Sequence, residues 1–318
     1  MVARATSFSR IPGVRVGHAV AAGTASGVTV VRFDRARPVV VDVRGGASAT
    51  YDIGSLSLAA TYGRRWAIFF AGGSVFGLDA ARGVRTRLLE EGDGHRAFAN
   101  PNAILPITGA ALFDLPTRTS PIPDYLPLGY AASRAASHAP FPDGATGAGA
   151  GASVGKYRGR SRASPGGLGA VAARSPWGRV GALVVVNAVG AVRDPTTGAW
   201  VAGARDRRGA IDPPDGRGDR RRPGDSHTTL ALVVTELVLG RPALARVAEI
   251  AAGGLARAVV PYATSLDGDL LFVASTEARR HSPRAGPIET IVDRIGAMAA
   301  DLVVEATLRA VRRPARGR

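Results

Sequence analysis

The sequence SHTTLALVVTELVL at residues 226–239 sets the architecture of this chain. From Thr229 to Leu239 it is long, apolar and rich in β-branched residues, which is typical of a strand buried at the centre of a sheet. The segment before it, at 204–225, reads ARDRRGAIDPPDGRGDRRRPGD and holds too much Pro, Gly and charge to be core. A polar arm therefore runs directly into a buried strand, and hydroxyl side chains stand where the two meet.

This junction allows two interpretations. In the first, an ordinary surface loop leads to Thr228, which opens a strand. In the second, residues 205–227 are a flexible linker in a self-cleaving precursor, and the hydroxyl of Thr228 attacks the peptide bond before it. Cleavage would free an N-terminal Thr whose α-amine, with a pKa near ~8, can accept the proton of its own hydroxyl. Such a site requires neither Cys nor a Ser-His-Asp triad.

Hydrophobic periodicity predicts a mixed α/β fold along the rest of the chain. Because strands and helices alternate without a clear βαβ rhythm, we expect one domain, residues 1–318, with packed sheets between helical layers. The expected strands are 36–43, 67–71, 180–186, 229–239 and 270–275, and the expected helices are 56–62, 78–91, 131–137, 241–259 and 288–311.

Composition excludes several classes of protein. The 318 residues are 46% hydrophobic, which argues against a disordered chain, and they include no Cys, which excludes disulfide scaffolds, Cys nucleophiles and thiolate metal sites. The first 20 residues hold no apolar run resembling a signal peptide. The longest apolar stretch, 180–192, is too short to span a membrane. We therefore expect a soluble, cytoplasmic protein without a membrane partner.

The net charge of +16 suggests nucleic acid at first sight. About half of the excess lies in 205–222 and 309–318, however, and the residues at 310–318 read as a basic disordered tail. Since neither a recognition helix nor an aromatic stripe accompanies the charge, we expect solvated segments and no nucleic-acid partner.

Lys156 is the one lysine among 41 Lys and Arg residues. Lys can lose its proton when buried, whereas Arg cannot, so a Lys that has not become Arg points to a function. It ends the Gly-rich stretch DGATGAGAGASVGK, residues 143–156, whose small residues permit close approach to a ligand. A phosphate-binding loop is excluded, because Ala150 replaces the first Gly of that motif and Tyr157 replaces the hydroxyl residue after the Lys.

Five motifs stand in consistent order along the chain. They are Gly13-Val-x-Val-Gly-His18, Ala71-Gly-Gly-Ser-Val-Phe-Gly-Leu-Asp-Ala-Ala81, Ala145-Thr-Gly-Ala-Gly-Ala-Gly-Ala-Ser-Val-Gly-Lys156, Val184-Val-Val-Asn187 and Thr228-Thr-Leu230. Together they resemble the self-processing aminopeptidases and amidases, which include the L-aminopeptidase/D-esterases, the β-aminopeptidases and the 6-aminohexanoate-oligomer (nylon-oligomer) hydrolases, and the resemblance covers about residues 11–305. The Thr-Thr junction is most similar to the nylon-oligomer branch, since the peptidase branches commonly use Ser.

The resemblance implies a single-domain, four-layer α/β/β/α sandwich like that of the N-terminal-nucleophile hydrolases. It also implies autocleavage into a heavy chain, 1–227, and a light chain, 228–318, and assembly into ring-like homo-oligomers, often tetramers. No cofactor is implied.

The functional residues of the family carry over position by position. Thr228 matches the nucleophile, so cleavage is expected between His227 and Thr228. Asn187 matches an asparagine whose amide donates to the oxyanion, although an Asn at a strand end also favours a turn. Lys156 matches a lysine beside the nucleophile, either as an ammonium that stabilises negative charge or as a neutral amine that moves protons.

Further positions match the substrate side of the family's site. Asp267 and Asp269 match an acidic pair that can hold the new α-ammonium, with Asp267 expected nearer and Ser265 a participant; an Asp-Gly turn is the alternative for one of them. Phe113 is expected to line the substrate cleft. The turn Gly72-Gly73-Ser74 either supplies backbone donors or only permits tight packing.

One departure from the family pattern and two absent motifs complete the expectation. Relatives usually carry Asn or Gly before the nucleophile, so His227 predicts slow or temperature-dependent processing. The remaining histidines show no metal-ligand spacing and there is no dinucleotide fingerprint, so neither a metal nor a cofactor is expected.

The predicted function is therefore hydrolysis of linear amides by an N-terminal threonine. The expected substrates are 6-aminohexanoate oligomers or related ω- and β-amino acid amides. An L-aminopeptidase/D-esterase or β-aminopeptidase acting on short peptides is the alternative within the same chemistry. An acyltransferase of the ornithine acetyltransferase type and a basic nucleic-acid-binding protein are the more distant alternatives.

Overall fold

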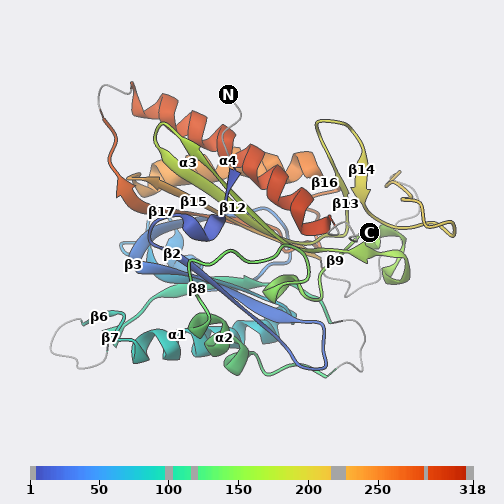
Figure 1. Cartoon of the computed structure of the whole chain (residues 1–318), viewed down its shortest axis with the longest axis horizontal. Helices are drawn as coiled ribbons and strands as arrows, with labels where there is room; N and C mark the ends of the chain where they lie inside the picture. Colours follow the sequence, from blue (N-terminus) through green and yellow to red (C-terminus); the bar gives the residue numbers. More distant parts are fainter. Residues whose placement is uncertain (1–4, 97–102, 116–120, 216–226, 283–285, 313–318) are drawn as a thin grey trace.

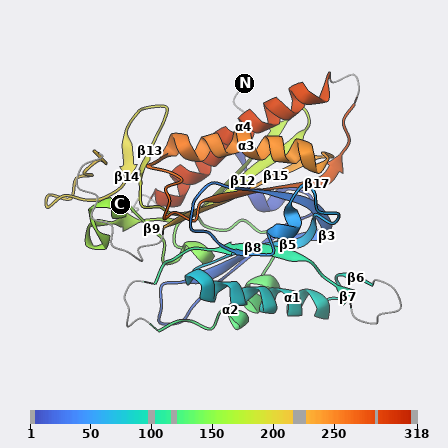
Figure 2. The same cartoon turned by 180° about the vertical axis from the view of Figure 1, so that it is seen from behind.

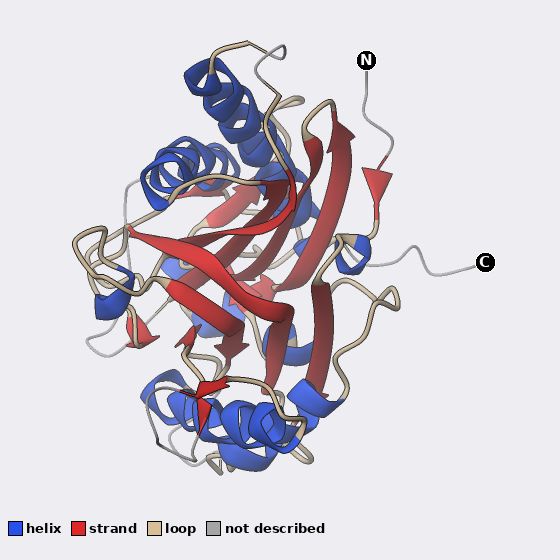
Figure 3. Cartoon of the chain, turned by 90° about the vertical axis from the view of Figure 1, so that its left-hand side faces the viewer, coloured by secondary structure: helices blue, strands red, loops and turns tan. Residues whose placement is uncertain are grey.

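The computed structural model describes residues 5–96, 103–115, 121–215, 227–282 and 286–312. Its elements stack in four layers, helix on sheet on sheet on helix, which confirms the expected sandwich (Figure 1). Helices α3 (Arg241–Ala258) and α4 (Ile288–Val311) form one outer layer, and α1 (Ala80–Glu90) and α2 (Tyr125–Arg134) form the other, as the reverse view also shows (Figure 2). Figure 3 shows the strands enclosed between these helical layers.

Among the described residues, ten strands form one continuous path through the two middle layers. The strands with their bounds are β1 Ala5–Thr6, β2 Val14–Val20, β3 Gly27–Val43, β4 Ala49–Tyr51, β5 Arg64–Ala71, β6 His95–Arg96, β7 Ala103–Ile104, β8 Ile107–Ala111, β9 Ser153–Val154, β10 Ser164–Pro165, β11 Gly167–Ser175, β12 Gly178–Asn187, β13 Ala191–Arg193, β14 Trp200–Ala202, β15 Thr228–Leu237, β16 Val259–Val260 and β17 Leu270–Arg279. Their order in the main sheet is β1-β11-β12-β15-β17-β3-β5-β8-β4, with β2 also paired to β3. In the same part of the chain, β6 with β7, β9 with β10, and β13 with β14 and β16 form three small separate sheets.

Strand β3 joins the two layers. Its C-terminal part pairs antiparallel with β17, and its N-terminal part pairs with β2 and β5, with an irregularity between Arg32 and Arg37 where the strand changes sheet. We call β1, β11, β12, β15, β17 and the C-terminal part of β3 the first sheet, and the remaining strands of the path the second sheet.

Three apolar clusters fill the three spaces between the layers. Strand β15 shows why its sequence is continuously apolar. Ala231 and Val233 face α3 and α4, whereas Leu230, Leu232 and Val234 face the second sheet. Because successive side chains of a strand point to opposite faces, a strand covered on both sides must be apolar at every position.

Helices α3 and α4 pack closely enough that one glycine is required between them. A Cβ on Gly254 would lie 2.3 Å from the carbonyl oxygen of Ala300. Any larger residue would therefore force the two helices apart.

Most predicted elements are confirmed with shifted ends. The helix predicted at 288–311 and the strands at 180–186, 229–239 and 270–275 correspond to α4, β12, β15 and β17. The helix predicted at 131–137 begins earlier, at Tyr125, because Asp124 caps it by accepting a hydrogen bond from the N–H of Leu126.

The helix predicted at 56–62 is wrong. Only a short 3-10 turn, Gly54–Leu56, forms there, and the chain then runs through turns. The guanidinium of Arg241 donates to the carbonyl oxygens of Leu56, Ser57 and Ala60. These are the acceptors that a helix would use within itself, so a side chain from α3 replaces the helical hydrogen bonds.

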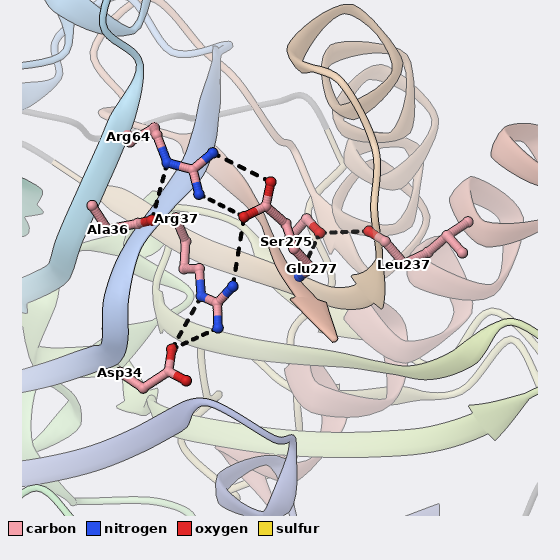
Figure 4. Close-up of polar contacts among 7 residues, drawn as sticks. All are labelled: Asp34, Ala36, Arg37, Arg64, Leu237, Ser275 and Glu277. Carbon is pink, nitrogen blue, oxygen red and sulfur yellow. Dashed lines mark hydrogen bonds and ion pairs between the residues drawn. The ribbon is translucent and has the colours of Figure 1, made fainter. Parts of the chain in front are cut away.

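A network of charged side chains ties the first sheet to the second (Figure 4). At the end of β17, Glu277 accepts hydrogen bonds from Arg64 on β5 and lies 3.5 Å from the guanidinium of Arg37 on β3. Arg37 also bonds Asp34, at 2.6 Å, and its own side chain is 4% exposed. Since a buried guanidinium must be paired, this network constrains how the sheets meet.

Candidate active site

The strand that carries Thr228 lies at the centre of the first sheet, and its first residue is Thr228 itself. Antiparallel pairing with β12 places Asn187, the last residue of that strand, opposite Thr228. Both residues are buried, with 0% of Asn187 and 2% of Thr228 exposed. The sheet register therefore brings together two of the residues that the sequence singles out.

Lys156 reaches the same point from the end of the Gly-rich stretch. Its Nζ atom donates to the backbone oxygen of Asn187 at 2.8 Å and to its side-chain oxygen at 2.7 Å. The turn that delivers it requires Gly155, whose φ is +80° and whose Cβ would lie 2.0 Å from the nitrogen of Ala204. Lys156 is 2% exposed, so its amine lies in a site shielded from water.

These contacts orient the amide of Asn187. Its side-chain oxygen also accepts from the N–H of Ser153 at 3.1 Å, and its Nδ2 atom donates to the backbone oxygen of Phe113 at 2.9 Å. Because oxygen and nitrogen each have fixed partners, the NH₂ group is directed away from Lys156 and can present a second hydrogen to a ligand.

Asp269 lies on the other side of β15. Its carboxylate accepts from the N–H of Thr229 at 2.5 Å and from the N–H of Ala263 at 2.9 Å. Burial, and next the charge of Asp267, raise the pKa of Asp269 to about 7. The group can therefore change charge near neutral pH, as acid–base chemistry requires.

Asp267 lies beside the residue that precedes Thr228. It pairs with His227 through a parallel β-bridge, and its carboxylate accepts from the N–H of Thr264 at 2.8 Å. The carboxylate of Asp269 accepts the hydrogen bond from the backbone N–H of Thr229 in β15. That Asp267 lies nearer the freed α-amine stays a prediction. Ser265 lies exposed on the outer side of this loop.

Gly268, between the two aspartates, contacts the peptide bond at which cleavage is predicted. Its N–H donates to the carbonyl oxygen of His227 at 2.6 Å. A Cβ at this position would lie 2.6 Å from Oγ1 of Thr228. Sequence reasoning treated Gly268 only as part of a turn; the signal was its place between two acids of a matched motif.

Asp114, which sequence reasoning also missed, lies beside this site. Its carboxylate accepts from the N–H of Gly73 at 2.9 Å, so one predicted backbone donor of the Gly72-Gly73-Ser74 turn is used within the protein. A Cβ on Gly72 would lie 2.2 Å from Asp114 Oδ2, which explains the small residue there. Burial raises the pKa of Asp114 to about 6, while the charge of Lys156 acts in the opposite direction.

Phe113 joins the site through its backbone, as the acceptor for Asn187. Its half-buried ring lies under the guanidinium of Arg160, 5.0 Å from the ring centre. Whether this ring lines a substrate cleft stays a prediction.

Of the predicted linker, 205–215 are described and 216–226 lie outside the described residues, as does most of the predicted tail at 310–318. The described part includes a turn closed by hydrogen bonds from Arg208 and Ala210 to Asp206. His227, where the description resumes, is fully buried.

Within the described residues, no helix is both long and apolar enough to cross a membrane. Nor do three His, Asp or Glu side chains of this part of the chain converge as metal ligands would.

Comparison with known proteins gives a consistent result. The model of peptidase family S58 matches residues 7–316. An uncharacterized aminopeptidase of Mycobacterium tuberculosis is 35% identical, over 96% of this chain and 93% of its own, and a 6-aminohexanoate-oligomer endohydrolase of a Kocuria strain is 29% identical, over 95% and 84%. The L-aminopeptidase D-Ala-esterase/amidase of Ochrobactrum anthropi, described as a variant of the Ntn (N-terminal nucleophile) hydrolase fold, superposes with a TM-score of 0.67 at 17% identity, over 96% and 85%.

Proposed function

This chain belongs to peptidase family S58 and is an amide hydrolase, and from that premise we propose that it cleaves itself before Thr228 and uses the freed threonine as its nucleophile. The relatives named above include an uncharacterized aminopeptidase and a 6-aminohexanoate-oligomer endohydrolase, and both names denote cleavage of amide bonds. The proposal assigns the nucleophile, the supporting residues and the substrate class.

One observation carries the proposal: the hydroxyl-bearing first residue of a central strand is surrounded by buried groups suited to acyl transfer. Asn187 lies opposite Thr228 with its amide oriented, Lys156 is held on Asn187, and Asp269 binds the adjacent N–H. Buried polar side chains need hydrogen-bond partners, which these three have, and a cluster of such groups that includes a carboxyl with a raised pKa is typical of functional sites.

In the proposed reaction, Thr228 Oγ1 attacks the substrate carbonyl carbon while the α-amine of Thr228 accepts the hydroxyl proton. The second N–H of the Asn187 amide stabilises the oxyanion, and Lys156 fixes that amide and adds positive charge. The amine product leaves with a proton, and water then hydrolyses the ester on Thr228. Asp269, with Asp267 beyond it, balances the charge of the α-ammonium between steps.

We propose linear amides of ω- or β-amino acids as substrates, with 6-aminohexanoate oligomers as the first to test. The likeness to an endohydrolase that acts on such oligomers, and a Thr in place of Ser at the junction, support this choice. We further propose a cytoplasmic homotetramer.

An aminopeptidase is the second candidate, favoured by the 35% identity to a protein of that name and by Asp114. A buried carboxyl beside the site would pair with the α-ammonium of a peptide substrate. Free-amine and N-acylated substrates distinguish the two candidates, because an endohydrolase accepts both.

The test uses the purified full chain on a denaturing gel, N-terminal sequencing of its fragments, and assays with 6-aminohexanoate oligomers and aminoacyl-p-nitroanilides. We expect two fragments, the smaller beginning at Thr228, and amide hydrolysis by the cleaved form. Thr228→Ala should abolish both, whereas Thr229→Ala, which removes the neighbouring hydroxyl, should leave cleavage in place. A Thr228→Ala protein that still matures and turns over substrate would exclude the proposal.

A further inference from the structure

Two atoms that take part in the predicted cleavage, the carbonyl oxygen of His227 and the hydroxyl oxygen of Thr228, lie close to one residue, Gly268. The carbonyl oxygen of His227 accepts the N–H of Gly268 at 2.6 Å. A Cβ on Gly268 would lie 2.6 Å from the hydroxyl oxygen of Thr228. The attacking oxygen and the oxygen that becomes the oxyanion therefore both lie beside the same glycine.

We propose that the backbone N–H of Gly268 is the oxyanion donor for self-cleavage, a role separate from that of Asn187 in substrate turnover. This inference rests on the proposed function, because it concerns the maturation step. It makes Gly268 a catalytic group in that step, since its N–H touches the reacting carbonyl oxygen.

The step balances as an N-to-O acyl shift followed by hydrolysis. Thr228 Oγ1 bonds to the carbonyl carbon of His227 and gives its proton to a base in the site, while the carbonyl oxygen becomes an oxyanion facing the Gly268 N–H. The C–N bond then breaks, and the nitrogen of Thr228 takes a proton, which leaves an ester. Water cleaves the ester, restores the hydroxyl of Thr228 and leaves a carboxylate on His227.

The surroundings of Gly268 keep its N–H in place. The segment after β3 donates hydrogen bonds to the carbonyl oxygens on both sides of Gly268. The N–H of Ala47 donates to the oxygen of Asp267 at 2.8 Å, and the N–H of Gly45 donates to the oxygen of Asp269 at 2.9 Å. Asp267 and Gly268 themselves are anchored to His227 by a β-bridge and by the hydrogen bond. A preorganised donor of this kind stabilises developing charge without reorganising at the moment of reaction.

The first test is Gly268→Ala, in which the added methyl group would meet the attacking hydroxyl. We expect uncleaved precursor to accumulate, with self-cleavage slowed about 100-fold or more. Gly253→Ala is the matched control, because the Cβ at Gly253 meets nothing within 4 Å. Circular dichroism and the unfolding midpoint of both variants show whether the precursor is folded.

The second test removes the N–H without adding a side chain. Replacing Gly268 by glycolic acid during translation turns its amide into an ester, and we expect self-cleavage to slow about 10-fold or more. The same change makes the carbonyl oxygen of Asp267 a weaker acceptor for the N–H of Ala47. Lactic acid in place of Ala47 removes that same hydrogen bond from the other side and is the control, with a rate expected within twofold of the unmodified chain.

The outcomes separate this inference from the proposed function. If the unmodified chain shows no break before Thr228, the proposed function fails. If it breaks there and the glycolic-acid protein is cleaved as fast, or the lactic-acid control slows equally, only the role of Gly268 is overturned.

Discussion

The amine of Lys156 is held by two oxygens of a single residue, Asn187, 31 positions away in the sequence. The contact lies between buried groups, so the charge of one and the orientation of the other depend on each other. In the proposed mechanism, Lys156 therefore acts on Thr228 through Asn187 as well as through its own charge.

We predict that Lys156 and Asn187 contribute non-additively to catalysis. Asn187→Ala should lower kcat about 100-fold, as loss of an oxyanion donor does. Lys156→Met should cost a comparable factor, since the Asn187 amide loses the partner that fixes its oxygen. The double variant should be little worse than either one. Stopped assays on cleaved enzyme measure this; fully multiplicative losses would mean that the residues act independently.

The raised pKa of Asp269 predicts a pH-dependent stability. Its pKa rises from 3.8 to about 7 in the folded chain, so the folded state holds this proton more tightly than the unfolded state. This group's contribution to the unfolding free energy should therefore fall as pH rises from about 4 to about 7.

Urea unfolding in a Thr228→Ala background tests this expectation. The stability of Asp269→Asn relative to its parent should improve between pH 5 and pH 8, because Asn cannot ionise. Asp293→Asn, on an exposed position of α4, serves as control and should show no such trend. An unchanged difference for Asp269→Asn across this range would contradict the prediction.

The inter-sheet network predicts a second pH effect of opposite sign. Hydrogen bonding to Arg64 lowers the pKa of Glu277 below its ordinary 4.5. Its stabilising contribution is thus complete above that value and is lost as pH falls below it. Glu277→Gln should cost about 1–2 kcal/mol at pH 7, because Arg37 and Arg64 lose their shared carboxylate.

A surface pair provides the comparison for Glu277. Arg246 and Glu249 lie 2.8 Å apart but are 62% and 54% exposed. Glu249→Gln should therefore change the unfolding free energy by less than about 0.5 kcal/mol. If urea denaturation gives equal losses of unfolding free energy for Glu277→Gln and Glu249→Gln, burial of the network adds no stability.

Asp114 predicts how the enzyme recognises its substrate. If its carboxylate pairs with a substrate ammonium, Asp114→Asn should raise KM about 10-fold for free-amine substrates and leave N-acylated ones within twofold. Because the pKa of Asp114 is raised to about 6, KM for free amines should also increase as the pH falls through 6 in the parent enzyme. Equal changes in KM for both substrate classes would assign Asp114 a purely structural role.

Local patterns in the chain were sufficient to predict the layered fold, the central strand at 229–239 and the helix at 288–311. Hydrophobic periodicity and secondary-structure propensity depend on residues close in sequence, so both can be recognised without knowledge of the tertiary contacts. The matched motifs also singled out Lys156, Asn187 and Asp269, and the folded chain gathers these three around Thr228.

Contacts between distant segments could not be predicted in this way. The pairing of β15 with β12 and β17 brings the backbone of Gly268 to His227 and the carboxylate of Asp269 to the N–H of Thr229. The guanidinium of Arg241, on α3, donates to the carbonyl oxygens of Leu56 and Ala60, so a side chain from another layer replaces the hydrogen bonds of a helix there. These arrangements follow from sheet register and from satisfying buried polar groups, and both arise from the chain packed as a whole.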